Sequence, residues 1–159
     1  MTQPTRPNLT AGVLGAVVGA LLGAVGWALL VSVTNFKIGY AAVGVGALTG
    51  LLAGRLGGGA PQLPAVSAAV GLVGCFVGDL LTDAHVLSSE LHDRGTDLSM
   101  FRILRTAVEH PSAFGWPLYK AGFGFLDVVF YAFAALAAFR LATRHGLAHQ
   151  QPDRAPTLT

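Results

Sequence analysis

The sequence predicts an all-α, polytopic membrane protein with four transmembrane helices, and two observations on composition support this prediction. Of the 159 residues, 53% are hydrophobic and 11% are charged, whereas ordinary soluble domains carry about 25% charged residues. The mean hydropathy is +0.60. A chain with so few charged side chains cannot cover a globular surface with polar groups, so its apolar surface must face lipid. A net charge of only +2, with scattered Lys and Arg residues, excludes a nucleic-acid-binding stripe.

A third observation is that four apolar runs are long enough to cross a bilayer, which takes roughly 20 helical residues. In chain order, the predicted spans are residues 11–34, 38–56, 63–81 and 117–141. Trp116 and Pro117 open the last span, where tryptophan suits the headgroup level and proline suits a first helical turn. The short connections between the first three spans predict antiparallel neighbours.

The segment 83–116 is the largest part predicted to lie outside the membrane. Apolar residues recur within it at helical spacing, namely Leu98, Phe101, Leu104 and Val108, with Met100, Ile103 and Ala107 beside them. Polar residues occupy most of the opposite face. The pattern predicts a short interfacial amphipathic helix on the membrane surface, between the third and fourth spans, with Asp97 as its N-cap.

The membrane domain is predicted to cover residues 11–142. The tails, residues 1–10 and 143–159, are polar and contain proline, so we expect them to be disordered. Arg6 followed by an apolar run with small residues also fits a cleaved signal peptide. Because the run continues to Val33, an uncleaved membrane helix is the favoured interpretation.

The basic residues are divided equally between the two sides of the membrane. The side of the termini holds Arg6, Arg55, Arg140, Arg144 and Arg154, and the other side holds Lys37, Arg94, Arg102, Arg105 and Lys120. Arginines directly at helix ends weigh most in the positive-inside rule, and these lie on the side of the termini. We therefore expect both termini to be cytoplasmic, in an inner or plasma membrane.

Glycine recurs at every fourth position in two spans. The rows are Gly15, Gly19 and Gly23 in the first span, and Gly46, Gly50 and Gly54 in the second. The absence of side chains along such a row lets helix backbones approach closely, which drives association in lipid. The rows either pack the protein's own helices or place one groove against a second copy or another membrane protein, as in glycine-zipper oligomers.

Asp127 is the most informative polar residue in the sequence. It lies about 15 Å into the predicted fourth span, near the membrane midplane, and an intramembrane carboxyl group is by default a functional-site hypothesis. Lys120 and Tyr131 share its helical face. This face either passes protons or cations, or holds a neutral Asp127 hydrogen-bonded to Tyr131 or to a backbone carbonyl exposed at a glycine. Asp79 and Lys120 are expected at similar depth, either as an ion pair or with Lys120 extended to the headgroups.

Acidic and histidine residues gather around the end of the third span: Asp79, Asp83, His85, Glu90, His92 and Asp93. Their oxygen and imidazole groups suit divalent metals, but their spacing matches no metal motif and we predict no metal or cofactor. The order of residues matches no catalytic triad, phosphate-binding loop or zinc-protease helix. The single cysteine, Cys75, excludes an intramolecular disulfide and a cysteine-based zinc site.

Two stretches of the sequence carry a resemblance to a known group of proteins. Residues 35–51, NFKIGYAAVGVGALTGL, and residues 125–135, FLDVVFYAFAA, resemble a widespread group of small bacterial integral membrane proteins. The resemblance covers nearly the whole membrane part and implies a four-helix architecture. Some members have an N-terminal zinc ribbon, for which this chain lacks the cysteines. The group has no assigned activity, so the resemblance implies none.

Three functions follow in order of preference. The first is a non-enzymatic membrane scaffold or subunit, whose partners are the bilayer and a second copy or another membrane protein. The second is a small transporter or channel component that uses Asp127. The third is a metal-dependent membrane enzyme that uses segment 79–93. A dry, hydrogen-bonded carboxyl group would favour the first, and a water-filled path would favour the second. The third requires several of its acidic and histidine side chains to converge.

Overall fold

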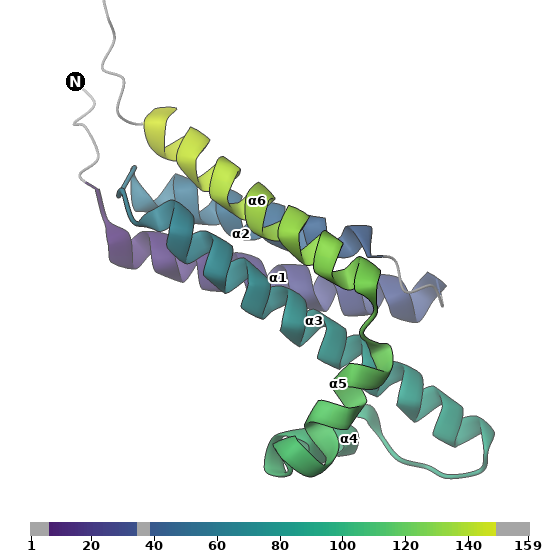
Figure 1. The fold of residues 1–159 in the computed structure, drawn as a ribbon. Coiled ribbons are helices and arrows are strands. Elements are labelled where there is room, and N and C mark those ends of the chain that lie inside the picture. Colours follow the sequence, from purple (N-terminus) through teal and green to yellow (C-terminus); the bar gives the residue numbers. More distant parts are fainter. Residues whose placement is uncertain (1–6, 35–38, 149–159) are drawn as a thin grey trace, which may run out of the picture.

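The computed structural model describes residues 7–34 and 39–148, and it is helical nearly throughout (Figure 1). Its elements are α1 (Leu9–Thr34), α2 (Tyr40–Gly57), α3 (Leu63–Asp93), α4 (Met100–Glu109), the π-helix η1 (Pro111–Gly115), α5 (Trp116–Gly122) and α6 (Phe125–Ala148). This confirms the predicted all-α class. The turn predicted around residues 35–37 and most of both tails lie outside the described residues. Where the tails are described, α1 already begins at Leu9 and α6 extends to Ala148, so the prediction of disorder is wrong there.

Four helices, α1, α2, α3 and α6, are long and apolar enough to cross a membrane. The chain is therefore a multi-pass membrane protein, as the apolar runs predicted. Two of the predicted limits were wrong. Helix α3 continues past Leu81 to Asp93, and the fourth spanning helix begins at Phe125 instead of Pro117.

The break before α6 has a local cause. Gly122 and Gly124 flank Phe123, whose backbone is extended (φ −91°, ψ 121°), and glycine is a weak helix former. The Gly124 N–H donates to the Asp127 carboxylate at 2.6 Å, while the Asp127 N–H donates to the Gly124 carbonyl at 3.1 Å. This reciprocal pair resembles a capping box and starts a new helix. The prediction of one continuous helix over 117–141 failed because this cap outweighs the apolar pattern.

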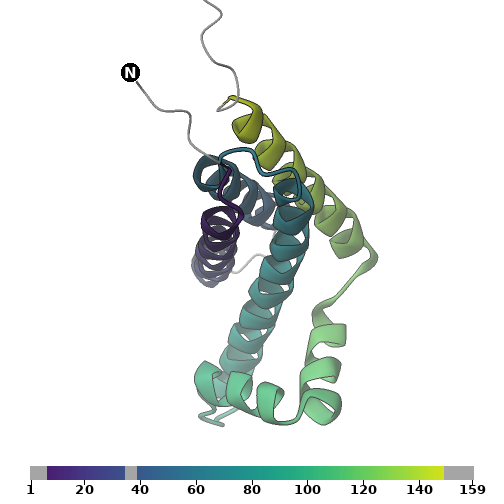
Figure 2. The ribbon, with the colours of Figure 1, turned by 90° about the vertical axis from the view of Figure 1, so that its left-hand side faces the viewer.

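Helices α2 and α3 contact each other, and α1 and α6 each pack against both of them. Figures 1 and 2 show α1 and α6 on opposite sides of this pair. The N–H of Asn8, before α1, bonds to the carbonyl of Gly57 at 3.0 Å. The start of α1 and the end of α2 thus lie at one end of the bundle, as an antiparallel hairpin requires.

The glycine row of α1 packs against the backbone of α2. A Cβ atom added at Gly15 would lie 2.6 Å from the carbonyl oxygen of Leu52, and one added at Gly19 would lie 2.6 Å from that of Leu48. At Gly23 the nearest atom would be the Cα of Val45, at 2.8 Å. Only the absence of side chains allows these two backbones to lie so close.

The glycine row of α2 packs in the same way against α6. A Cβ atom at Gly46 would overlap the carbonyl of Ala134, and one at Gly50 would overlap that of Ala138. At Gly54 it would lie 2.9 Å from the Cβ of His145. Both rows are thus filled from within the chain, which agrees with the interpretation that they pack the protein's own helices.

Helix α4 is present as the amphipathic pattern predicted, but its N-cap differs. Ser99, the residue before the helix, is extended and makes no side-chain cap hydrogen bond. Asp97, the predicted cap, instead contacts His92 at 2.7 Å. The apolar stripe is also divided, because Ile103 and Ala107 are buried while other members of the stripe remain exposed.

A pair of matched substitutions on α2 tests the close packing. Gly50→Ala should lower the melting temperature in detergent, because its methyl group meets the Ala138 backbone and overpacking typically costs about 1–3 kcal/mol. Gly44→Ala is the control, since nothing lies within 4 Å of a Cβ there. It should leave the melting temperature unchanged or slightly raised. Equal melting temperatures for the two variants would contradict the close approach of α2 and α6.

Candidate functional site

Asp79 of α3 carries a carboxyl group that is buried within the bundle. Its residue is 1% exposed, and the Tyr131 hydroxyl of α6 donates a hydrogen bond to Asp79 Oδ2 at 2.5 Å. Counting about 1.5 Å per residue, Asp79 lies roughly 24 Å along α3 from Leu63. It therefore lies inside a hydrocarbon core of about 30 Å, near the boundary opposite the chain termini. The hydrogen bond joins α3 to α6 at this level.

Tyr119 brings α5 to the same place. It is 8% exposed, and its hydroxyl interacts with that of Tyr131. Its ring lies 4.7 Å from the ring of Phe76 on α3 and 5.0 Å from that of Phe123 (centroid distances). Phe123 in turn lies edge-on to Tyr131 at 5.9 Å. Aromatic contacts thus anchor α5 beside Asp79.

Two further buried polar side chains lie close to Asp79 in the bundle, one on α1 and one on α3. Trp27 of α1 is 2% exposed and Thr82 of α3 is fully buried. The Trp27 ring packs over Gly78, where a Cβ atom would lie 2.8 Å from ring carbon Cε3. Neither Trp27 Nε1 nor Thr82 Oγ1 has a hydrogen-bond partner in the part of the chain that the structure describes. We call Asp79, Thr82, Tyr119, Trp27 and the partly buried Tyr131 the polar cluster.

Asp127 is not near the membrane midplane. Because α6 begins at Phe125, Asp127 lies in the first turn of α6, at the bundle end where the Asp79–Tyr131 bond lies. Its side chain accepts the Gly124 N–H instead of bonding Tyr131. The predicted Asp127–Tyr131 pair is therefore wrong, and Asp79 replaces Asp127 as the intramembrane carboxyl group of interest.

The alternative of an ion pair between Asp79 and Lys120 is not found either. Lys120 lies in α5 with an exposed side chain, and the ion pairs between described residues do not join it to Asp79. The other interpretation, in which Lys120 extends to the headgroups, agrees with this exposure. Lys37, the other lysine assigned to this side of the membrane, lies outside the described residues.

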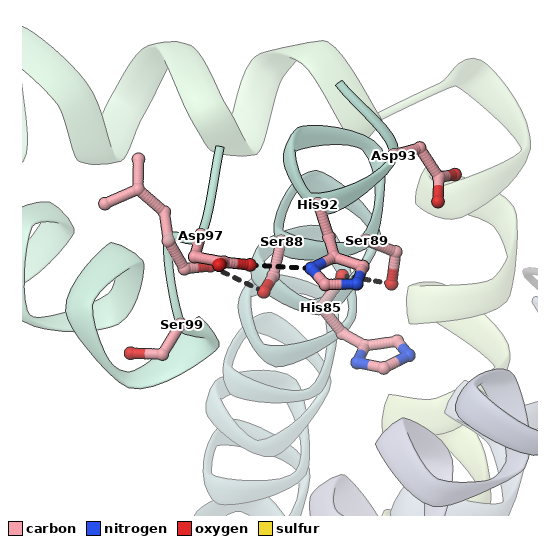
Figure 3. Close-up of a pocket in the computed structure, with 8 residues that line it drawn as sticks. His85, Ser88, Ser89, His92, Asp93, Asp97 and Ser99 are labelled. Carbon is pink, nitrogen blue, oxygen red and sulfur yellow. Dashed lines mark hydrogen bonds and ion pairs between the residues drawn. The ribbon is translucent and has the colours of Figure 1, made fainter. Parts of the chain in front are cut away.

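A polar hollow of about 540 Å³ lies at the far end of α3 (Figure 3). Its lining residues are His85, Ser88, Ser89, His92, Asp93, Asp97, Leu98 and Ser99. His92 Nδ1 lies 2.7 Å from Asp97 Oδ1, with both side chains largely exposed. Ser88 Oγ donates to the Leu98 carbonyl at 2.8 Å. These bonds hold the segment before α4 against α3 and give the hollow its shape.

The acidic and histidine side chains on which the metal-enzyme alternative depends do not converge among the described residues. Within residues 7–34 and 39–148, no three His, Cys, Asp or Glu side chains are placed to hold one metal ion. Asp79 faces the bundle and His92 pairs with Asp97. The convergence that the metal-enzyme alternative requires is not seen in this part of the chain.

The single cysteine, Cys75, is buried and free. Its Sγ lies 3.6 Å from the Ala42 carbonyl oxygen, and its neighbours are Trp27, Val31 and Ala134. It packs as a small apolar residue, as free cysteines in apolar surroundings usually do.

Comparison of the chain with protein-family models, curated proteins and solved structures finds no match. The resemblance to small bacterial membrane proteins stays a prediction, and the geometry above carries the functional argument.

Tyr131→Phe tests the buried hydrogen bond. The substitution removes the hydroxyl that Asp79 accepts from, and leaving a buried polar group unpaired costs about 1–3 kcal/mol. The variant should therefore melt at a lower temperature in detergent. Tyr40→Phe is the matched control, because Tyr40 is 73% exposed, and it should melt like the wild type. In an Asp79→Leu background the effect of Tyr131→Phe should shrink, and an undiminished effect would contradict the pairing.

Proposed function

We propose that this protein is a non-enzymatic membrane scaffold or subunit, in which a closed helical core holds the polar hollow between α3 and the segment before α4 at one membrane surface for a protein partner. The observation that carries this proposal is the state of Asp79. Its carboxyl group is 1% exposed and accepts the hydroxyl of Tyr131. A dry, hydrogen-bonded carboxyl group joins helices, whereas a group that transfers ions must be reached by water or by its cargo.

The glycine rows support the same proposal and change how the association would occur. The glycine row of α1 packs against α2, and the glycine row of α2 packs against α6. Neither row is therefore available to a second copy in this fold. A partner, whether a second copy or a different membrane protein, would therefore use the outer surface. The hollow offers histidine, serine and aspartate side chains that can hydrogen-bond to a partner.

We place the protein in the inner or plasma membrane of a bacterial cell, among the small four-helix membrane proteins that it resembles. Both termini would be cytoplasmic, since Arg55 lies in the last turn of α2, and Arg140 and Arg144 lie in the C-terminal part of α6, on their side of the membrane. The hollow would then face the outside of that membrane.

Site-specific photo-crosslinking tests the scaffold role. A benzophenone amino acid at Ser99, which lines the hollow, should give one discrete protein adduct in native membranes. The same group at Ser112, which is exposed but does not line the hollow, is the matched control and should not give that adduct. The adduct should weaken in the double variant His92→Ala, Asp97→Ala, which releases the segment before α4. Failure to form an adduct at Ser99, or identical adducts at both positions, would argue against the scaffold.

The second candidate, a small transporter or channel component, now rests on Asp79, which is buried within the bundle, whereas Asp127 lies in the first turn of α6. Asp79→Asn keeps an acceptor for Tyr131 but cannot exchange a proton. We expect neither wild-type protein nor this variant to carry protons or sodium ions into liposomes, and we expect both to melt at similar temperatures. Flux through wild type that disappears in a folded Asn variant would replace the scaffold with a transporter.

A further inference from the structure

Helix α4 has an apolar edge that no part of the described chain covers. Ile103 and Ala107 are buried at 3% and 4% exposure, and they take the side that faces the protein. Phe101 and Val108, about two helical turns apart, are 77% and 74% exposed. Leu104 lies between them and is partly buried. Large apolar side chains this exposed are costly in water, at about 25 cal/mol per Å².

The direction of α4 matches the plane of a membrane. Figure 1 shows the four long helices from the side and α4 close to end-on, and Figure 2 shows α4 running across the direction of α3. A helix that lies across the spanning helices is parallel to the bilayer surface. This is the orientation of interfacial amphipathic helices.

The attachments of α4 also set its depth. Before α4, Leu98 is bonded to Ser88, which lies about 38 Å along α3 from Leu63. After α4, the chain returns through η1 to Tyr119, which packs on Phe76, about 20 Å along α3. A hydrocarbon core of about 30 Å ends between these two levels. Helix α4 is thus attached to α3 at two levels, one inside the hydrocarbon core of the membrane and one outside it.

Exposed aromatic residues mark the same boundary. Tyr40 at the start of α2, Trp116 at the start of α5 and Phe125 at the start of α6 are 73%, 56% and 83% exposed. All three lie at the bundle end that α4 occupies. Aromatic side chains gather at membrane–water interfaces, so the apolar edge of α4 continues a surface that we expect lipid to cover.

From direction, depth and continuity with the lipid-facing surface, we propose that α4 is an interfacial anchor whose Phe101–Leu104–Val108 edge binds phospholipid at the boundary between acyl chains and headgroups. On the polar side, Arg102 and the Arg105–Glu109 pair, joined at 2.7 Å, face the headgroups and water. Lipid is the occupant because the edge meets the membrane that the four helices already span. This anchor is independent of the scaffold role and would hold the hollow at a constant height above the bilayer.

Spin labels placed on adjacent residues of α4 test this anchor. In a Cys75→Ser background, Val108→Cys and Phe101→Cys place labels on the apolar edge, and Glu109→Cys and Arg102→Cys place labels on the polar side. The protein is studied in nanodiscs of phosphatidylcholine and phosphatidylglycerol. Labels at 108 and 101 should collide mainly with oxygen, which dissolves in lipid, and labels at 109 and 102 mainly with a water-soluble nickel chelate.

Two other outcomes would overturn the proposal. If the nickel chelate reaches the label at 108 as readily as that at 109, the edge faces water. If both reagents are excluded at 108 and the labels broaden each other's spectra, a second copy covers the edge. Melting temperatures of the four variants should agree, because all four positions are exposed. Should Phe101→Cys disturb folding, the pair at 108 and 109 decides the question.

Discussion

The close approach of helix backbones across the two glycine rows is the constraint on which the rest of this structure depends. In lipid, pairing of helices brings no hydrophobic gain. The free energy of association must therefore come from dispersion contacts between helix surfaces that lack side chains. Helix α2 stands at the centre of this arrangement because one of its faces receives Gly19 of α1 and another presents Gly50 to α6. A methyl group on either row would meet backbone, which cannot move aside as a flexible side chain can.

The tight core explains why one buried carboxyl group is tolerated. With α1, α2 and α6 packed close together around it, Asp79 is shielded from solvent, and the free-energy cost of burying its carboxyl group must be offset inside the protein. Tyr131 provides a hydroxyl from α6, and Tyr119 links the pair to α5. The polar cluster therefore adds a directional hydrogen bond to a core that is otherwise held by van der Waals contacts, which have no preferred direction. This hydrogen bond aligns α6 with α3.

The structure outside the core follows from one long helix and one broken helix. Helix α3 runs to Asp93, well past the length that a bilayer needs, and carries the hollow at its end. The cap formed by Gly124 and Asp127 ends the continuity of the predicted fourth helix, so that α5 can pack beside Phe76. Helix α4 lies between these two elements and keeps its orientation because it is attached at both ends.

The sequence by itself determined the all-α class, the four spans, the amphipathic segment and the glycine rows, because apolar length and helical spacing are local properties of the chain. It could not decide which helices the rows join, since this depends on how α1, α2 and α6 rotate against one another. The sequence also placed Asp127 too deep. Residues 122–127 look like part of one long apolar run, and the hydrogen bond between Gly124 and Asp127 that begins a new helix is visible only in the structure. Only the tertiary structure decided that Tyr131 bonds Asp79, since a hydrogen bond between two helices depends on their relative rotation and depth, and periodicity within one helix carries neither.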